Sequence, residues 1–137
     1  MQPFTTNQVP RIVAGPGRSS EIGAIVTELA GAGACVLLVA DNGLTGIGLT
    51  QRIADGLKDG GHRVVTHDAI VSDPKEPAVA EAVAIARQEG VGAVVCLGGG
   101  SALDAGKLVA AMIGACGKLE DYRLAAAALP VARVPLV

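Results

Sequence analysis

Residues 93–107 read AVVCLGGGSALDAGK: a short apolar strand runs directly into three glycines and then into a helix. A strand that feeds a glycine turn at a helix N-terminus leaves backbone N–H groups and the positive end of the helix dipole facing one point, where an anion can bind. Glycine costs conformational entropy, and the close approach of a ligand to the backbone is a reason to accept that cost. The segment therefore predicts a phosphate-binding bend.

The rest of the chain alternates between strand-like and helix-like hydrophobic patterns, which indicates repeated βα units around a parallel sheet. The strands are expected at 11–13, 35–40, 62–66, 91–97 and 131–136, and apolar residues at helical spacing mark helices over 22–29, 49–57, 79–86 and 102–115. Ser19 or Ser20 is a candidate N-cap for the first helix. The predicted fold is a Rossmann-like, doubly wound α/β domain with helices on both faces. No helix follows the last strand, so we expect the sheet to be truncated there.

Composition excludes several classes of partner. With 137 residues, half of them hydrophobic, the chain can form one domain with one core. Its net charge of −2 is spread along the sequence, and its aromatic residues are Phe4 and Tyr122, so neither a basic patch nor a base-stacking platform is expected. We therefore do not expect the protein to bind nucleic acid. The sequence has no leader pattern and no apolar run of ~18 residues, which predicts a cytoplasmic protein without membrane contact.

The cysteines and histidines do not suggest a metal site. Cys35, Cys96 and Cys116 lie far apart without C-x-x-C spacing and are predicted to be buried, reduced thiols. His62 and His67 are five residues apart beside a strand, so their side chains point to opposite faces and do not hold one ion. We expect both on the surface.

Three familiar motifs fail at identifiable positions of the glycine segment. The dinucleotide fingerprint and the nucleophile elbow both need glycine where Leu103 stands. A Walker A loop that ends at Lys107 needs glycine at Ser101 and a hydroxyl residue at Leu108. ATP hydrolysis and serine hydrolase chemistry are therefore not supported.

One combination remains: Gly98-Gly99-Gly100-Ser101 is followed at intervals of three residues by Asp104 and Lys107. It resembles the GGGSxxDxxK signature of the iron-containing alcohol dehydrogenase family. Shorter matches extend the resemblance over most of the chain, at 11–17, 39–41, 72–74, 119–122 and the strand after Pro130. Lys107 is expected to form a local ion pair with Asp104 and is not assigned a catalytic role.

The resemblance implies a domain organisation and a cofactor. Members of this family have an N-terminal Rossmann-like domain that binds NAD or NADP and a C-terminal helical domain that supplies most ligands of an iron or zinc ion. The resemblance implies that residues 1–137 are the first domain and that the second is absent. It also implies that Gly99, Gly100 and Ser101 contact the cofactor pyrophosphate while Gly98 makes the turn.

Asp41 is the predicted contact to the adenine ribose. An acid at the end of the strand after the first βα unit commonly accepts hydrogen bonds from the ribose. The charge of Asp41 would repel the 2′-phosphate of NADP, which favours NAD. The segment Asp41-Asn42-Gly43 is equally typical of a turn. The sequence leaves both interpretations open.

Asp73 and Asp104 complete the predicted cofactor site. Asp73 stands where many relatives carry asparagine near the cofactor, but with Pro74 after it, helix capping is the slightly better interpretation. Asp104 contacts the cofactor by resemblance, or forms an S-x-x-D capping pair with Ser101, or does both.

Two departures limit the activity that the resemblance implies. Where the family carries Pro-Thr-Thr, residues 134–137 read VPLV, and the metal ligands of the second domain are missing. We expect an isolated chain that positions NAD but is not a competent dehydrogenase, without catalytic or metal-binding residues. The family's reaction is hydride transfer between an alcohol or aldehyde and the nicotinamide. The alternative is a nonenzymatic dinucleotide-binding or interaction module whose last strand pairs with a second copy or with a missing C-terminal half.

Overall fold

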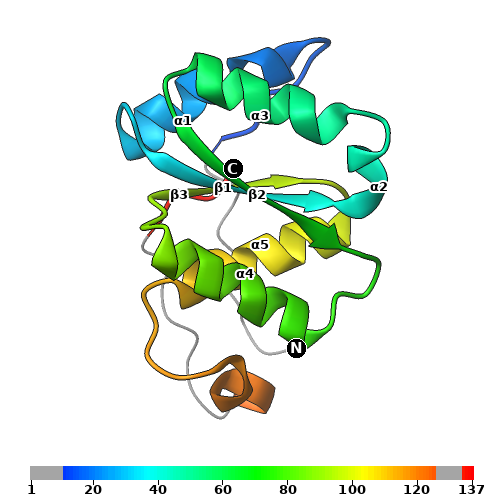
Figure 1. Cartoon of the computed structure of the whole chain (residues 1–137), viewed down its shortest axis with the longest axis vertical. Helices are drawn as coiled ribbons and strands as arrows, with labels where there is room; N and C mark the ends of the chain where they lie inside the picture. The colour runs from blue at the N-terminus through cyan, green and yellow to red at the C-terminus, as the bar shows by residue number, and fades with distance from the viewer. Residues whose placement is uncertain (1–10, 126–133) are drawn as a thin grey trace, which may run out of the picture.

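A parallel sheet lies between two layers of helices in the computed structural model, which describes residues 11–125 and 134–137 (Figure 1). In this part of the chain the sheet has three strands in the order β2-β1-β3: β1 (Cys35–Asp41), β2 (Arg63–Ile70) and β3 (Ala93–Leu97). Val39 pairs with His67 on one side and with Cys96 on the other. The predicted α/β fold with a parallel sheet is confirmed.

Helices cover both faces of the sheet, as expected for a doubly wound fold. In Figure 1, α1 and α3 lie above the sheet and α4 and α5 lie below it. The helical elements are η1 (Arg18–Glu21), α1 (Ile22–Ala30), α2 (Asn42–Thr45), α3 (Leu49–Asp59), α4 (Glu76–Gln88), α5 (Gly100–Met112) and η2 (Leu119–Ala125). Among the helices of the described ranges, none is both long and apolar enough to traverse a bilayer.

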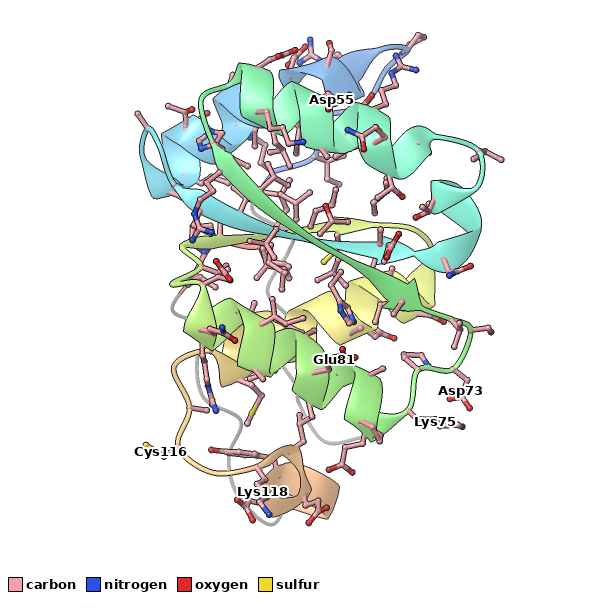
Figure 2. All side chains as sticks on the ribbon, in the orientation of Figure 1. Asp55, Asp73, Lys75, Glu81, Cys116 and Lys118 are labelled. Atoms are coloured by element: carbon pink, nitrogen blue, oxygen red, sulfur yellow. The ribbon has the colours of Figure 1, made fainter. Side chains whose placement is uncertain are left out.

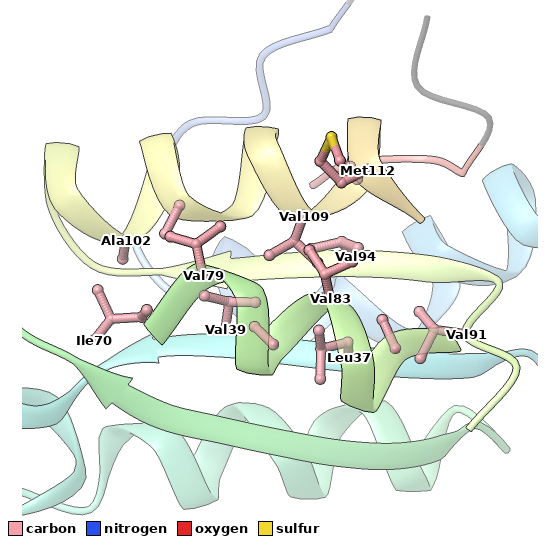
Figure 3. Packing of buried hydrophobic residues seen from close by; sticks show 14 residues of the cluster. Leu37, Val39, Ile70, Val79, Val83, Val91, Val94, Ala102, Val109 and Met112 are labelled. Atoms are coloured by element: carbon pink, nitrogen blue, oxygen red, sulfur yellow. The ribbon is translucent and has the colours of Figure 1, made fainter. Parts of the chain in front are cut away.

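The central strand explains the two-layer core. Val36 and Leu38 face α1 and α3, whereas Leu37 and Val39 face α4 and α5, and all four are fully buried. A strand that is covered on both faces is apolar along its length, in contrast to the alternating pattern of a half-exposed strand. Figure 3 shows the second layer, in which Leu37 and Val39 pack with Val79 and Val83 of α4 and with Val109 of α5.

The end of the chain lies beside β3. Residues 131–133 of the last predicted strand lie outside the described residues, but Leu136 forms a parallel bridge with Val94. The Val94 amide donates to the Pro135 carbonyl at 2.9 Å, and the Cys96 amide donates to the Val137 carbonyl at 2.7 Å. This segment therefore continues the sheet on the edge of β3 opposite β1.

The predicted strand at 11–13 is wrong. Residues 11–14 have no regular secondary structure, and Arg11 Nη1 lies 2.8 Å from Glu28 Oε1, so the segment passes along α1. The serine caps are also absent, because a 3-10 turn precedes α1 and Ser20 Oγ donates to the Gly17 carbonyl.

The prediction of surface histidines is wrong as well, since His62 and His67 are each 5% exposed. His62 Nε2 lies 3.0 Å from the Gly23 carbonyl oxygen and 3.0 Å from Thr27 Oγ1. Thr27 donates its only proton to the Gly23 carbonyl, so His62 Nε2 carries a proton and donates. The imidazole is buried because it joins the start of β2 to α1.

The thiols are reduced, as predicted, but their burial differs. Cys35 and Cys96 are half-buried in strands, whereas Cys116 is exposed in the connection after α5, which contradicts its predicted burial. Burial raises the pKa of Cys96 to about 11, and burial also raises the pKa of Cys35. The thiolate of Cys96 is therefore scarce near neutral pH.

This difference predicts unequal reactivity towards a thiol reagent such as Ellman's reagent at pH 8. Cys116 should react in a fast phase, while Cys96, with its pKa near 11, should react roughly a hundredfold more slowly than an ordinary thiol. Cys116→Ser should abolish the fast phase. A fast phase of unchanged amplitude in that variant would contradict the observed burial.

Candidate functional site

The chain connections diverge at the carboxyl ends of β1 and β3, the position at which open α/β sheets have a crevice. From β1 the chain reaches β2 through α3 on one face, and from β2 it crosses to β3 through α4 on the other face. In open α/β sheets, ligands bind where the connections from neighbouring strands diverge in this way. Figure 1 shows α2 and the starts of α4 and α5 gathered at this end of the sheet, on the right of the view.

Gly98 brings the glycine bend against the tip of β1. Its φ is 149°, and a Cβ atom there would lie 2.8 Å from the Ala102 Cβ and 3.1 Å from the Asp41 Cβ. A larger residue would meet both neighbours in a backbone conformation that side chains rarely adopt. The bend and Asp41, separated in sequence, are therefore direct neighbours.

The amides after Gly98 remain available. Helix α5 begins at Gly100 with Gly99 as its N-cap and without a side-chain cap. Among the described residues, no backbone oxygen accepts a hydrogen bond from the amides of residues 99–102. Gly99 and Gly100 are exposed, and a Cβ at either would meet nothing within 4 Å. Free amides at a helix N-terminus beside open space form the donor set that an anion needs.

Ser101 does not cap α5, so the predicted S-x-x-D pair is wrong. Because the glycines let the helix begin at Gly100, Ser101 is already its second residue. Its hydroxyl oxygen instead accepts a long hydrogen bond, 3.4 Å, from the Asp73 amide. This contact joins the loop after β2 to the start of α5.

Asp73 does not cap α4, contrary to the preferred interpretation of its sequence. The N-cap of α4 is Lys75, without a side-chain hydrogen bond, and the helix carries Pro77 in its first turn. Asp73 has a φ of 54°, and its exposed carboxylate pairs with Lys75 (Figure 2). The hydrogen bond from Lys75 lowers the pKa of Asp73. The carboxylate is thus ionised and locally neutralised beside Ser101.

Asp104 forms the predicted ion pair, with 3.0 Å between Lys107 Nζ and Asp104 Oδ1. Both side chains are exposed on α5, so the pair contributes little stability.

Asp41 does act as a turn residue. It is the N-cap of α2, and its Oδ1 atom accepts a hydrogen bond of 2.8 Å from the Gly43 amide. Within the described chain, no hydrogen bond occupies Oδ2. One carboxylate oxygen therefore stabilises the turn, while the other can accept a hydrogen bond from a ligand.

Two surface hollows lie away from the glycine bend. One, of about 580 Å³, is lined mainly by apolar residues of α1 and of the segments at 11–15 and 135–137. The other, of about 620 Å³, lies between η1 and α3. Neither shares a lining residue with the glycine bend.

The side chains of the described ranges contain no cluster of three or more histidine, cysteine or acidic residues that could hold a metal ion. An iron or zinc ion therefore does not fit the described residues.

Two predicted site residues depend on contacts that their sequence context does not indicate. Lys75 forms an ion pair with Asp73 across Pro74, whereas the Asp-Pro sequence is typical of a helix cap. Thr45 and Asp68 hold the helix that Asp41 caps, with 3.0 Å between Thr45 Oγ1 and Asp68 Oδ2. They are 23 residues apart, and no local sequence pattern reports such a contact.

A parallel α/β domain with an open glycine bend where its connections diverge has the architecture of a Rossmann-like domain. The family model described as iron-containing alcohol dehydrogenase matches residues 10–137. The chain belongs to the iron-containing alcohol dehydrogenase family.

Individual relatives agree with this membership. The chain is 30% identical over 114 residues to the NAD-dependent methanol dehydrogenase of Bacillus methanolicus, a match over 83% of this chain and 29% of that protein. The crystal structure of NADH-dependent butanol dehydrogenase A from Thermotoga maritima superposes with a TM-score of 0.86 at 29% identity, over 99% of this chain and 34% of that one.

A further solved relative contains a cofactor. Sulfoacetaldehyde reductase from Bifidobacterium kashiwanohense, in complex with NAD+, gives a TM-score of 0.77 at 26% identity, over 89% of this chain and 31% of that one. The chain thus spans about a third of the length of these relatives.

Proposed function

We propose that these 137 residues form the N-terminal NAD-binding domain of an NAD-dependent alcohol dehydrogenase. One observation carries the proposal: in the described structure the amides of residues 99–102 have no backbone hydrogen-bond acceptor, and the glycines at 99 and 100 face open space. The names of relatives that use NAD or NADH, and one solved in complex with NAD+, support the same cofactor.

The residues around the glycine bend suit different parts of a dinucleotide. The amides at Gly99, Gly100 and Ser101 would donate to the diphosphate, where the positive end of α5 adds to the attraction. The turn at Gly98 places Asp41 beside them, so its free oxygen would accept a hydrogen bond from the adenine ribose. Asp73 and Asp104, each paired with a lysine, would lie at the margin of the site.

In the whole protein, the reaction would be hydride transfer between an alcohol or aldehyde carbon and the nicotinamide. A bound dinucleotide supplies the hydride acceptor or donor, and this domain would bind and orient it. We assign the iron or zinc ion that stabilises an alkoxide to residues other than those that the structure describes, because these do not fit it.

Calorimetric titration with NAD and NADP tests the proposal directly, since the chain has no tryptophan to report binding by fluorescence. The proposal predicts saturable heat with NAD and weaker binding of NADP. No heat at millimolar NAD would contradict it.

Asp41→Asn separates charge from turn chemistry, because asparagine keeps the side-chain oxygen that accepts from the Gly43 amide. Removal of the charge should relieve repulsion of the 2′-phosphate and lower the ratio of the NADP to the NAD dissociation constant about tenfold, or roughly 1.4 kcal/mol. An unchanged ratio in a normally folded variant would remove Asp41 from the proposed ribose site.

The second candidate is an interaction module, which the apolar hollow beside the last segment favours. Leu136 lines this hollow and is 39% exposed next to the edge of the sheet. Addition of a separately expressed C-terminal half of a close homologue would distinguish the two. Restored alcohol oxidation supports the dehydrogenase, whereas stable association without oxidation supports the module.

A further inference from the structure

The four-residue helix α2 is too short to be stabilised by its own backbone hydrogen bonds. Side chains hold it at both ends. At the first turn, Asp41 Oδ1 accepts from the Gly43 amide. At the last residue, Thr45 Oγ1 donates to Asp68 Oδ2 at 3.0 Å and lies 3.0 Å from Thr50 Oγ1. The position of α2 therefore depends on the groups that bind these two side chains.

The direction of each hydrogen bond follows from the proton count. A hydroxyl group carries one proton, and a carboxylate only accepts. Because Thr45 gives its proton to Asp68, Thr50 must donate to Thr45. The result is a directed chain from Thr50 through Thr45 to Asp68, in which each bond polarises the next.

This chain anchors α2 to two rigid elements. Thr50 lies in the first turn of α3 and is 4% exposed, and Asp68 lies on β2, the strand that pairs with β1. Asp41, at the opposite end of α2, is the neighbour of Gly98 in the glycine bend. A change at Thr45 can therefore affect the glycine bend through α2 and Asp41.

We propose that Thr45 and Asp68 are positioning residues for Asp41: they fix α2 so that the Asp41 carboxylate stays beside the glycine bend in the orientation that accepts the adenine ribose of NAD. The inference rests on the proposed function, because it assumes that NAD binds at the glycine bend. Neither residue needs to touch the cofactor.

The test is a double-mutant cycle on the dissociation constant of NAD, measured by calorimetry with the whole chain. Thr45→Val keeps the side-chain shape and removes the hydroxyl, and should weaken NAD binding about fivefold. The conservative Thr45→Ser should restore binding to within about twofold. In an Asp41→Ala background, Thr45→Val should have almost no further effect, because no carboxylate remains to be positioned.

Thermal unfolding of each variant controls for folding. If Thr45→Val does not fold, Asp68→Ala and Asp68→Asn provide the same comparison, since asparagine retains an oxygen that accepts from Thr45 and alanine does not. Asp68→Ala should weaken NAD binding, and Asp68→Asn should retain most of it.

The outcomes distinguish this inference from the proposed function. If the unaltered chain binds no NAD, both fail. If it binds NAD and Asp41→Ala weakens binding, but Thr45→Val does not, only the positioning role is overturned. The positioning role is also overturned if Thr45→Val weakens NAD binding equally in the unaltered chain and in the Asp41→Ala background, because Thr45 would then act independently of the Asp41 carboxylate.

Discussion

Gly99→Val should abolish most NAD binding and leave the fold intact. The φ and ψ angles of Gly99, −84° and −163°, are extended and suit a β-branched residue, and a Cβ there meets no atom within 4 Å. The added side chain would instead occupy the space in front of the free amides. Loss of charge-assisted hydrogen bonds costs about 2 kcal/mol, so the dissociation constant of NAD should rise roughly 30-fold.

Gly92 provides a matched control at the opposite end of β3. A Cβ at Gly92 has the Cys35 carbonyl oxygen as its nearest neighbour, at 3.9 Å, so alanine fits there. Gly92→Ala and Gly99→Ala make the same chemical change, and only the second should weaken NAD binding. Equal affinity in these two variants, with normal binding by Gly99→Val, would show that the bend is not the binding site.

Gly106→Ala should cause the largest loss of stability. Gly106 lies on α5 where the helix crosses β3, and a methyl group there would overlap the Cys96 Sγ atom. Overpacking of this kind costs about 3 kcal/mol, because helix and strand must separate to relieve it. Denaturant unfolding should show this loss in the free energy of unfolding.

A second substitution should rescue this variant. In Cys96→Ala the sulfur is gone, and the nearest atoms to a methyl group on Gly106 are the residue-96 Cβ at 3.5 Å and the Leu136 Cδ1 at 3.7 Å. The double variant should therefore lie within about 1 kcal/mol of Cys96→Ala alone. A double variant as unstable as Gly106→Ala would mean that the sulfur is not the source of the clash.

The regular core was predictable because its signals are local. Apolar residues at helical spacing located α3 and α4, and the continuous apolar runs located β1 and β3 to within about two residues. The polar segment Thr66-His67-Asp68 has no strand-like pattern, so the predicted strand ended at residue 66, whereas β2 continues to Ile70 because it pairs with β1. The pairing with β1 therefore determines the strand conformation of this segment, and the intrinsic β-propensity of its polar residues does not.

Contacts between distant residues were not predictable in the same way. His62 is buried where the Gly23 carbonyl oxygen, 39 residues away in sequence, accepts a hydrogen bond from its Nε2. The sequence around Asp73 and around Ser101 is typical of a helix cap, but neither residue caps a helix. The glycines move the start of α5 to Gly100, and the Asp73 amide donates a hydrogen bond to Ser101 Oγ, 28 residues away in sequence. The glycine bend itself was predictable because strand, turn and helix N-terminus are contiguous in sequence.

The central claim is that the amides of the glycine bend bind the diphosphate of NAD. Titration of the ¹⁵N-labelled chain with NAD, followed by amide chemical shifts in NMR spectra, tests it residue by residue. The largest shifts should occur at Gly99, Gly100 and Ser101, with the same amides shifting on addition of ADP-ribose. Saturable binding that leaves these amides unshifted while others move would contradict the claim.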